Sequence, residues 1–224
     1  MAQTRSNKGR PPAKGARPPA KGATKSRAPF VIIGAAIVIA AVIAIVATRD
    51  SGNDNTTLAQ TQPVTVSGAA LPTLTGTGTD PALGRVVPEL TGAAFDGSVV
   101  SITNDGRPKV IIFIAHWCPH CQLEVPVITK WIAANGAPSG VDLYAVSTGV
   151  SKDRPNYPPS SWLAEEKWPL PTLADSGDAT AAQAFGLNAY PYFVVVNASG
   201  KLVYRATGEL DTTQLAQLVT LAKS

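Results

Sequence analysis

A run of 21 residues without one charged side chain, at positions 28–48, constrains this chain more than any other feature. The run is almost entirely Ile, Val and Ala, and as a helix it would be about 31 Å long, close to the thickness of a bilayer's hydrocarbon core. A cleaved signal peptide is the alternative. Its apolar region would be shorter, about 7–15 residues, and Ile45 stands where the cleavage site needs a small residue. We therefore predict an uncleaved transmembrane anchor over residues 28–48.

Charges are distributed unevenly on the two sides of this run. Residues 1–27 hold eight basic and no acidic residues, whereas the rest of the chain holds eleven basic and fifteen acidic residues, a net charge of −4. By the positive-inside rule, the N-terminus is cytoplasmic and the chain after residue 48 lies outside the cell membrane. Because the basicity belongs to a tail, a globular nucleic-acid-binding protein is excluded as the default. The tail, residues 1–27, repeats the string RPPAKGA and has nothing to bury, which predicts disorder.

The remaining chain divides by composition into a spacer and a core. Residues 49–84 are rich in Thr, Gly, Ser, Asn and Pro and poor in large apolar side chains, which predicts a flexible linker. Residues 85–224 hold all four Trp and all five Tyr, and their 140 residues suit one domain. We therefore place the folded domain at residues 85–224.

The order of predicted elements in this domain is typical of an α/β fold with a mixed central sheet flanked by helices. Apolar, β-branched runs predict strands and hairpins at residues 95–102 (on an Asp-Gly turn), 109–115, 141–147 and 192–205. Apolar residues at three- and four-residue spacing predict helices over residues 119–135, 160–167, 178–185 and 211–222, the last with Asp211 as its N-cap.

Both cysteines lie in the string WCPHC, residues 117–121, between a predicted buried strand and a predicted helix. Cys118 would be the helix N-cap and Pro119 the first helical residue, a position that proline favours. Cys118 and Cys121 then lie on one helix face, close enough to form a disulfide. Unpaired N–H groups and the helix dipole stabilise a thiolate at Cys118, which makes this sulfur a nucleophile near neutral pH. Cys121, one turn deeper, is predicted to be the resolving thiol.

Redox exchange is favoured over two other uses of this pair. A structural disulfide would close a loop of only four residues and so restrict the unfolded chain little. A metal site would use Cys118, Cys121, His116 and His120 as ligands. Their spacing in the sequence is poorly suited to placing four ligands around one ion, and the sequence has no further histidine. One alternative of a different class stays open, a metallochaperone that holds copper through the two cysteines. Redox exchange itself needs no metal or cofactor beyond the dithiol.

The strand, the WCPHC string and the helix resemble the thioredoxin superfamily, and within it the membrane-anchored TlpA/ResA-like thiol-disulfide oxidoreductases. The resemblance covers about residues 85–224. Its motifs are PEL at 88–90 with FDG at 95–97, AHWCPHC at 115–121, ExP at 124–126, and YP at 190–191 with NASGK at 197–201. It implies a thioredoxin-like fold, an active-site acid at Glu124, and a cis Pro191 that faces the dithiol.

Departures from the family pattern leave the direction of electron flow open. Ile112 stands where thioredoxin itself has a buried acid, and the dipeptide Pro119-His120 is similar to that of DsbA-type oxidases. A cationic His120 would stabilise the Cys118 thiolate and make the pair more oxidising. The stretch of residues 153–160 is longer than the family's motif pattern requires, which predicts a loop bordering the active site.

Four residues near the cysteines have predicted roles. Glu124 would accept or relay a proton for Cys121, although an exposed helical glutamate is the plainer interpretation. Trp117 would shape the rim for substrate docking, and the backbone of Tyr190 would pair with a bound peptide strand. His116 is interpreted as a strand-end polar residue.

Together these features predict an extracytoplasmic thiol-disulfide oxidoreductase anchored in the cell membrane by residues 28–48. Its partners would be exported protein thiols and disulfides, and a membrane redox partner that resets the dithiol. It would act either as a reductant, for cytochrome c or other exported thiols, or as an oxidant that installs disulfides.

Overall fold

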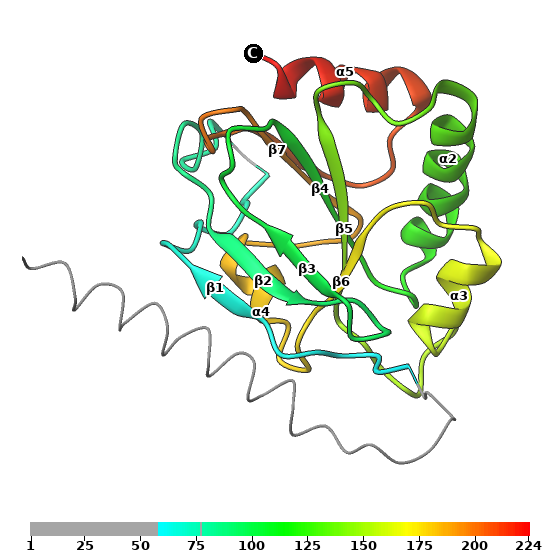
Figure 1. Cartoon of the computed structure of the whole chain (residues 1–224). Helices are drawn as coiled ribbons and strands as arrows, with labels where there is room; N and C mark the ends of the chain where they lie inside the picture. Colours follow the sequence, from blue (N-terminus) through cyan, green and yellow to red (C-terminus); the bar gives the residue numbers. More distant parts are fainter. Residues whose placement is uncertain (1–57, 77) are drawn as a thin grey trace, which may run out of the picture. The chain divides into compact units, whose positions relative to one another are not determined.

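The computed structural model describes residues 58–76 and 78–224 (Figure 1). The predicted tail, the predicted anchor and the first part of the predicted linker lie outside these residues. Within the described part of the chain, no helix has both the length and the apolar character needed to cross a membrane.

A mixed five-stranded sheet carries the fold, as predicted, in the strand order β6–β5–β4–β7–β8. Its strands are β4 (Lys109–Ile114), β5 (Asp142–Ser147), β6 (Thr172–Ala174), β7 (Tyr192–Val196) and β8 (Leu202–Thr207). β4, β5 and β6 run parallel, whereas β7 is antiparallel to both β4 and β8. Every residue of β4 and of β7 is buried, because both faces of the sheet are covered.

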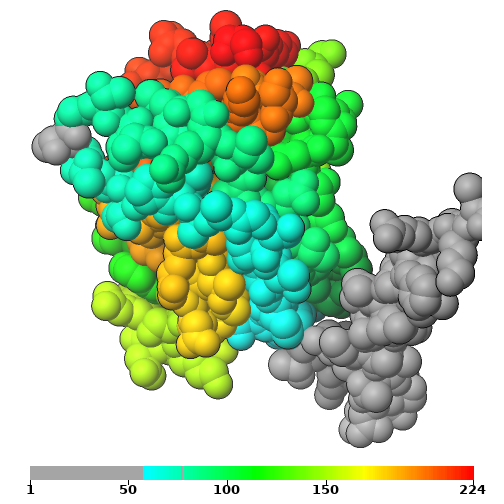
Figure 2. Space-filling model, turned by 90° about the vertical axis from the view of Figure 1, so that its left-hand side faces the viewer, coloured from blue at the N-terminus to red at the C-terminus, as the bar shows by residue number. Residues whose placement is uncertain are grey.

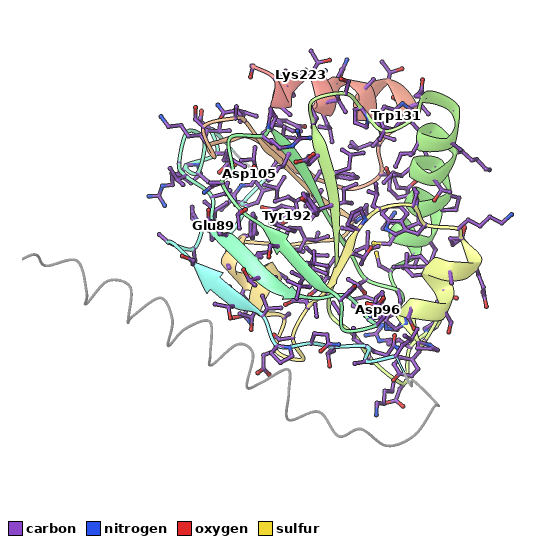
Figure 3. The ribbon with its side chains drawn as sticks, in the orientation of Figure 1. Glu89, Asp96, Asp105, Trp131, Tyr192 and Lys223 are labelled. Atoms are coloured by element: carbon purple, nitrogen blue, oxygen red, sulfur yellow. The ribbon has the colours of Figure 1, made fainter. Side chains whose placement is uncertain are left out.

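Three helices cover one face of this sheet: α2 (Pro119–Asn135), α3 (Pro159–Glu165) and α5 (Thr212–Ala222) (Figure 1). Their apolar side chains form one cluster with Val110, Ile112 and Ile114 of β4. Trp131 of α2 lies on the side of α5 (Figure 3) and belongs to the same cluster. Ile112, at the place of the missing strand acid, is therefore an ordinary core residue of this face.

Helix boundaries follow the sequence signals to within two residues. α2 spans the predicted residues, with Cys118 as N-cap and Pro119 as its first residue. α5 begins after Asp211, whose carboxylate accepts the backbone N–H of Gln214 at 2.8 Å, while the Gln214 side chain accepts the N–H of Asp211. This reciprocal pair is a capping box, and it confirms the predicted N-cap.

A small sheet and a short helix cover the opposite face. β1 (Thr65–Ser67), β2 (Glu89–Ala93) and β3 (Val99–Ile102) are antiparallel in that order, and α4 (Thr180–Ala184) packs with them. The predicted hairpin on Asp96 and Gly97 is present, but its first strand lies earlier in the chain than residue 95. Asp96 marks its turn, and Tyr192 lies in the interior between the sheets (Figure 3).

The predicted linker is wrong from residue 58 onward, because residues 58–76 and 78–84 pack on the domain. β1 pairs with β2, and Leu71 is only 5% exposed. The backbone N–H groups of Leu71 and Leu74 donate to the carbonyls of Ala184 and Gly186, at 2.8 and 3.0 Å. Figure 2 shows this segment, in cyan, beside the gold residues of α4. Backbone bonds hold it, and a composition poor in apolar residues does not reveal them.

A buried ion pair holds the same segment on β8. The Arg205 side chain is fully buried, and its Nε and Nη2 each donate to an Asp80 carboxylate oxygen at 2.6 Å. Its Nη1 donates to the Pro72 carbonyl at 2.8 Å and to the Tyr192 hydroxyl at 3.1 Å. Such bidentate, charge-assisted bonds are strong and directional, so Asp80 belongs to the folded domain and not to a linker.

Candidate active site

The two cysteines lie where β4 ends and α2 begins. Cys118 has extended backbone angles, φ −77° and ψ 121°, and Cys121 is one turn into the helix. Both are free thiols. Cys118 is 6% exposed, whereas Cys121 is fully buried. This graded burial is the arrangement expected of an attacking and a resolving thiol.

Burial also changes the acidity of the deeper sulfur. Burial raises the pKa of the Cys121 thiol far above its usual value. A hydrogen bond with the Ala115 backbone opposes this effect, whereas the nearby Cys118 and Glu124 raise the pKa of Cys121 further. Cys121 is therefore protonated near neutral pH. It needs a proton acceptor before it can attack another sulfur.

Glu124 is the ionisable side chain placed to accept that proton. It is 1% exposed, so the plainer interpretation as an exposed helical glutamate is wrong. Its Oε2 accepts the backbone N–H of Leu210 at 2.9 Å, while Oε1 has no hydrogen-bond partner among the described residues. Burial raises the pKa of Glu124 to about 7, with the Leu210 bond opposing and the Glu209 charge adding to the effect. A carboxyl that titrates near neutrality can take up and release a proton in the working pH range.

Pro191 follows a cis peptide bond from Tyr190, as the family resemblance implied. The Cys118 sulfur lies 3.8 Å from the Tyr190 carbonyl, at the donor–acceptor distance of a weak S–H bond. The Tyr190–Pro191 segment thus faces the dithiol.

Trp117 and Tyr190 form an aromatic pair beside Cys118. Their rings meet edge to face, with centroids 5.7 Å apart. The Trp117 indole N–H donates to the Gly149 carbonyl at 2.7 Å. Gly149 has φ +61°, and a Cβ there would lie 2.8 Å from the Tyr190 hydroxyl, so only glycine fits at this contact.

His116 is more than the predicted strand-end polar residue. It is fully buried, and its Nδ1 lies 2.7 Å from the Pro155 carbonyl, so Nδ1 carries the proton and Nε2 accepts the Ser151 N–H at 3.2 Å. The His116 carbonyl accepts the side-chain amides of Gln122 and Asn156. Burial lowers the pKa of His116, although the bond to Pro155 opposes the effect, so the neutral imidazole is favoured.

These contacts place a loop at the edge of the dithiol site. We call residues 149–157 the rim loop; it connects β5 to α3, and residues 152–157 are exposed. Gly149, Ser151, Pro155 and Asn156 each contact His116 or Trp117. The prediction of a loop bordering the active site over residues 153–160 is confirmed up to residue 158, since Pro159 begins α3.

His120 points to a carboxylate that the sequence pattern did not reveal. Its side chain is 65% exposed, and Nδ1 lies 2.6 Å from Oε1 of Glu209, 89 residues later in the chain. Glu209 also precedes Leu210, whose N–H binds Glu124. The short segment before α5 therefore contacts two predicted site residues at once.

A metal would find few ligands here. In the region covered by residues 58–76 and 78–224, no group of three or more His, Cys, Asp or Glu side chains could hold a metal ion. Both ring nitrogens of His116 are engaged by the backbone of the rim loop. The copper alternative is thus confined to the two cysteine sulfurs, and it stays a prediction.

Comparison with known proteins agrees with this geometry. The family model described as Redoxin matches residues 67–221. The chain belongs to the redoxin family. The matched region begins within β1, which agrees with the corrected domain boundary.

Two curated relatives and one solved structure indicate which redoxins this chain is similar to. The thiol:disulfide interchange protein DsbE homolog of Paracoccus denitrificans is 30% identical over 132 residues, which are 57% of this chain and 68% of that protein. The soluble secreted antigen MPT53 of Mycobacterium tuberculosis is 35% identical over 74 residues, 30% of this chain and 40% of the antigen. A thiol:disulfide interchange protein of the thioredoxin family from Chlorobium tepidum has a TM-score of 0.51 and 20% identity, over 65% of this chain and 99% of that chain.

Family membership and these relatives confirm the thioredoxin-like fold and the predicted enzyme class. This redoxin is a thiol-disulfide oxidoreductase. Sequence patterns did not single out Gly149, Arg154 or Glu209, although all three contact predicted site residues. The unexplained length of residues 153–160 was the one signal that pointed toward Arg154, and no signal pointed toward Gly149 or Glu209.

Proposed function

We propose that this redoxin exchanges disulfides with exported proteins outside the cell membrane, with Cys118 as the attacking and Cys121 as the resolving sulfur. One observation carries the proposal. The more exposed sulfur is at the N-cap of α2 beside the Tyr190–Pro191 segment, and the fully buried one is a turn deeper next to a proton acceptor. Only Cys118 is then within reach of a second protein.

In the reductive direction, the Cys118 thiolate attacks one sulfur of a substrate disulfide. The S–S bond breaks, the second substrate sulfur leaves as a thiolate and takes up a proton, and a mixed disulfide links Cys118 to the substrate. Cys121 then loses its proton and attacks the Cys118 sulfur, which releases the substrate's remaining thiol. Two electrons have passed to the substrate, and the enzyme holds the Cys118–Cys121 disulfide. The oxidative direction is the reverse sequence.

Glu124 supplies the proton transfer for the second step. Cys121 is buried and protonated, so its attack requires a base that works near neutral pH. Glu124 has a pKa of about 7 and one carboxylate oxygen without a partner among the described residues. In the reverse direction the same carboxyl returns the proton to Cys121.

The extracytoplasmic location rests on the sequence. Eight basic residues precede the uncharged run 28–48, which favours a cytoplasmic N-terminus and a catalytic domain outside. A TlpA/ResA-like anchored enzyme would receive or pass on its electrons through a membrane redox partner. A reporter that is active only in the cytoplasm, fused after Ser224, should be silent. Activity of that reporter would contradict the topology.

The test of the exchange proposal is a trapping experiment with the full-length protein. Cys121→Ser should accumulate a reductant-sensitive mixed disulfide with exported proteins, because the resolving sulfur is absent, whereas Cys118→Ser should accumulate none. Equal trapping by the two variants would contradict the assigned roles. The reduction potential of the Cys118–Cys121 couple then decides the direction, since a value near that of thioredoxin favours a reductase and a markedly higher value favours an oxidase.

A further inference from the structure

An arginine, Arg154, lies at the edge of the dithiol site. The guanidinium carbon of Arg154 is 4.6 Å from the centroid of the Trp117 ring, a cation–π distance. Trp117 in turn meets Tyr190, whose carbonyl is 3.8 Å from the Cys118 sulfur. A continuous path of contacts therefore leads from the reacting sulfur to the guanidinium.

The position of Arg154 is held by the loop that carries it. The Arg154 backbone N–H donates to the Ser151 carbonyl, and the Ser151 N–H donates to buried His116. On the other side of Arg154, the Pro155 carbonyl accepts the Nδ1–H of His116. Because Ser151 and Pro155, on either side of Arg154, both bond to the buried side chain of His116, Arg154 lies on a loop that is held in place. That loop projects, yellow-green, at the lower left of Figure 2.

Arg154 forms no ion pair within the part of the chain that the structure describes. The ion pairs there join Arg107 to Asp142, Lys109 to Asp105, His120 to Glu209, and Arg205 to Asp80. Trp117 covers one face of the guanidinium, whereas its N–H donors lie in the plane of the group and stay available to an acceptor. A planar fork of donors fits a carboxylate, which it can bind with two parallel hydrogen bonds.

We propose that Arg154 is a specificity-determining residue that pairs with a substrate carboxylate, so that this redoxin prefers disulfides with an Asp or Glu a few residues from the reacting cysteine. The inference rests on the proposed function, because it assumes that a substrate sulfur meets Cys118. An extended peptide advances about 3.3 Å per residue. A chain that passes Tyr190 and Trp117 therefore brings a side chain two to four residues from its cysteine to Arg154.

The test uses three peptides of one sequence, each with a single cysteine held in a disulfide with 2-mercaptoethanol. They differ at one position three residues from the cysteine, which is Glu, Gln or Lys. The rate constant for reduction of each peptide by the reduced full-length protein is measured at low salt. Wild type should reduce the Glu peptide about two- to fivefold faster than the Lys peptide, a ratio within the range expected of an exposed charge pair. Arg154→Gln should bring this ratio close to one, and Arg154→Glu should invert it.

Lys152→Gln is the matched control, because it removes the same charge from the same loop, whereas the cation–π contact with Trp117 among the described residues is made by Arg154. It should keep the wild-type ratio. An equal ratio in wild type and Arg154→Gln, or an equal loss in Lys152→Gln, would overturn the assignment to Arg154. The Gln peptide separates this failure from that of the proposed function. If wild type reduces the Gln peptide no faster than Cys118→Ser does, the exchange mechanism itself is wrong.

Discussion

At the scale of single residues, the site depends on burial more than on residue type. Two cysteines separated by two residues differ in exposure, and a glutamate that would be unremarkable on a helix surface is enclosed next to the deeper one. The residue types and their spacing were enough to predict, from the sequence, the attacking and the resolving cysteine. The enclosure of Glu124 was not, because it depends on Leu210 and the segment before α5, which lies 86 residues away.

Replacing Glu124 by Gln tests the consequence of that enclosure. The folded-state pKa of about 7 lies above the ordinary value of 4.5, so the group favours folding at acidic pH, and this contribution is lost as the pH rises through 7. Glu124→Gln should therefore be more stable than wild type at pH 8.5, by on the order of 2–3 kcal/mol, and similar to it near pH 4.5. Urea unfolding at the two pH values measures this difference.

The same variant should also change the kinetics. Resolution of the mixed disulfide by Cys121 should be slower in Glu124→Gln, and the increase of its rate around pH 7 should disappear, since no carboxylate is left to accept the proton. A wild-type pH profile in the variant would show that Glu124 plays no part in the transfer.

His120 has a prediction of its own. If its imidazole stabilises the Cys118 thiolate, His120→Ala should make the couple more reducing, by about 30 mV for each tenfold change in equilibrium constant. The potential is measured against glutathione. Equal potentials for wild type and variant would mean that His120 pairs with Glu209 and does not influence the couple.

At the scale of elements, the helices and the longer strands were predictable, whereas the shortest strands were not. The boundaries of α2 and α5 follow from the Cys118–Pro119 start and from the Asp211 cap, which are local signals. β1 and β6 have three residues each, too few to show a period of two. The rim loop could be recognised by its length, but its attachment to His116 could not, because the ligands of the imidazole are backbone groups that any residue carries.

The attachment of the rim loop should depend on pH. Burial lowers the pKa of His116 below its ordinary 6.5, so the unfolded chain binds a proton first as the pH falls, and stability is lost below about pH 6.5. A protonated Nε2 can no longer accept the Ser151 N–H. Between pH 7.5 and 5.5, wild type should lose more stability than His116→Gln, as measured by urea unfolding. Parallel changes in the two proteins would contradict the role of His116.

At the scale of the whole molecule, the domain begins earlier than composition indicates. A Thr-, Gly- and Pro-rich stretch with few apolar residues is typical of a linker, yet here it supplies β1, buried Leu71 and the Asp80 carboxylate. What holds it is a buried arginine on β8, 125 residues further along the chain. Pairs at such separations leave no trace in local composition.

Two truncated chains test this boundary. Residues 58–224 should fold and unfold cooperatively, because they contain Asp80 together with Arg205. Residues 85–224 should be destabilised by at least about 3–5 kcal/mol, because Arg205 is then a buried charge without its partner.

Asp80→Asn in the longer chain separates the effect of the ion pair from the effect of the lost packing. In wild type, the hydrogen bond with Arg205 is the main cause that lowers the pKa of Asp80. The ion pair therefore stabilises the fold above the ordinary Asp pKa of 3.8, and this stabilisation is lost as the pH falls through the lower pKa of the folded state. Urea unfolding at pH 7 should therefore place Asp80→Asn between the two chains in stability, and an 85–224 chain as stable as 58–224 would restore the linker interpretation.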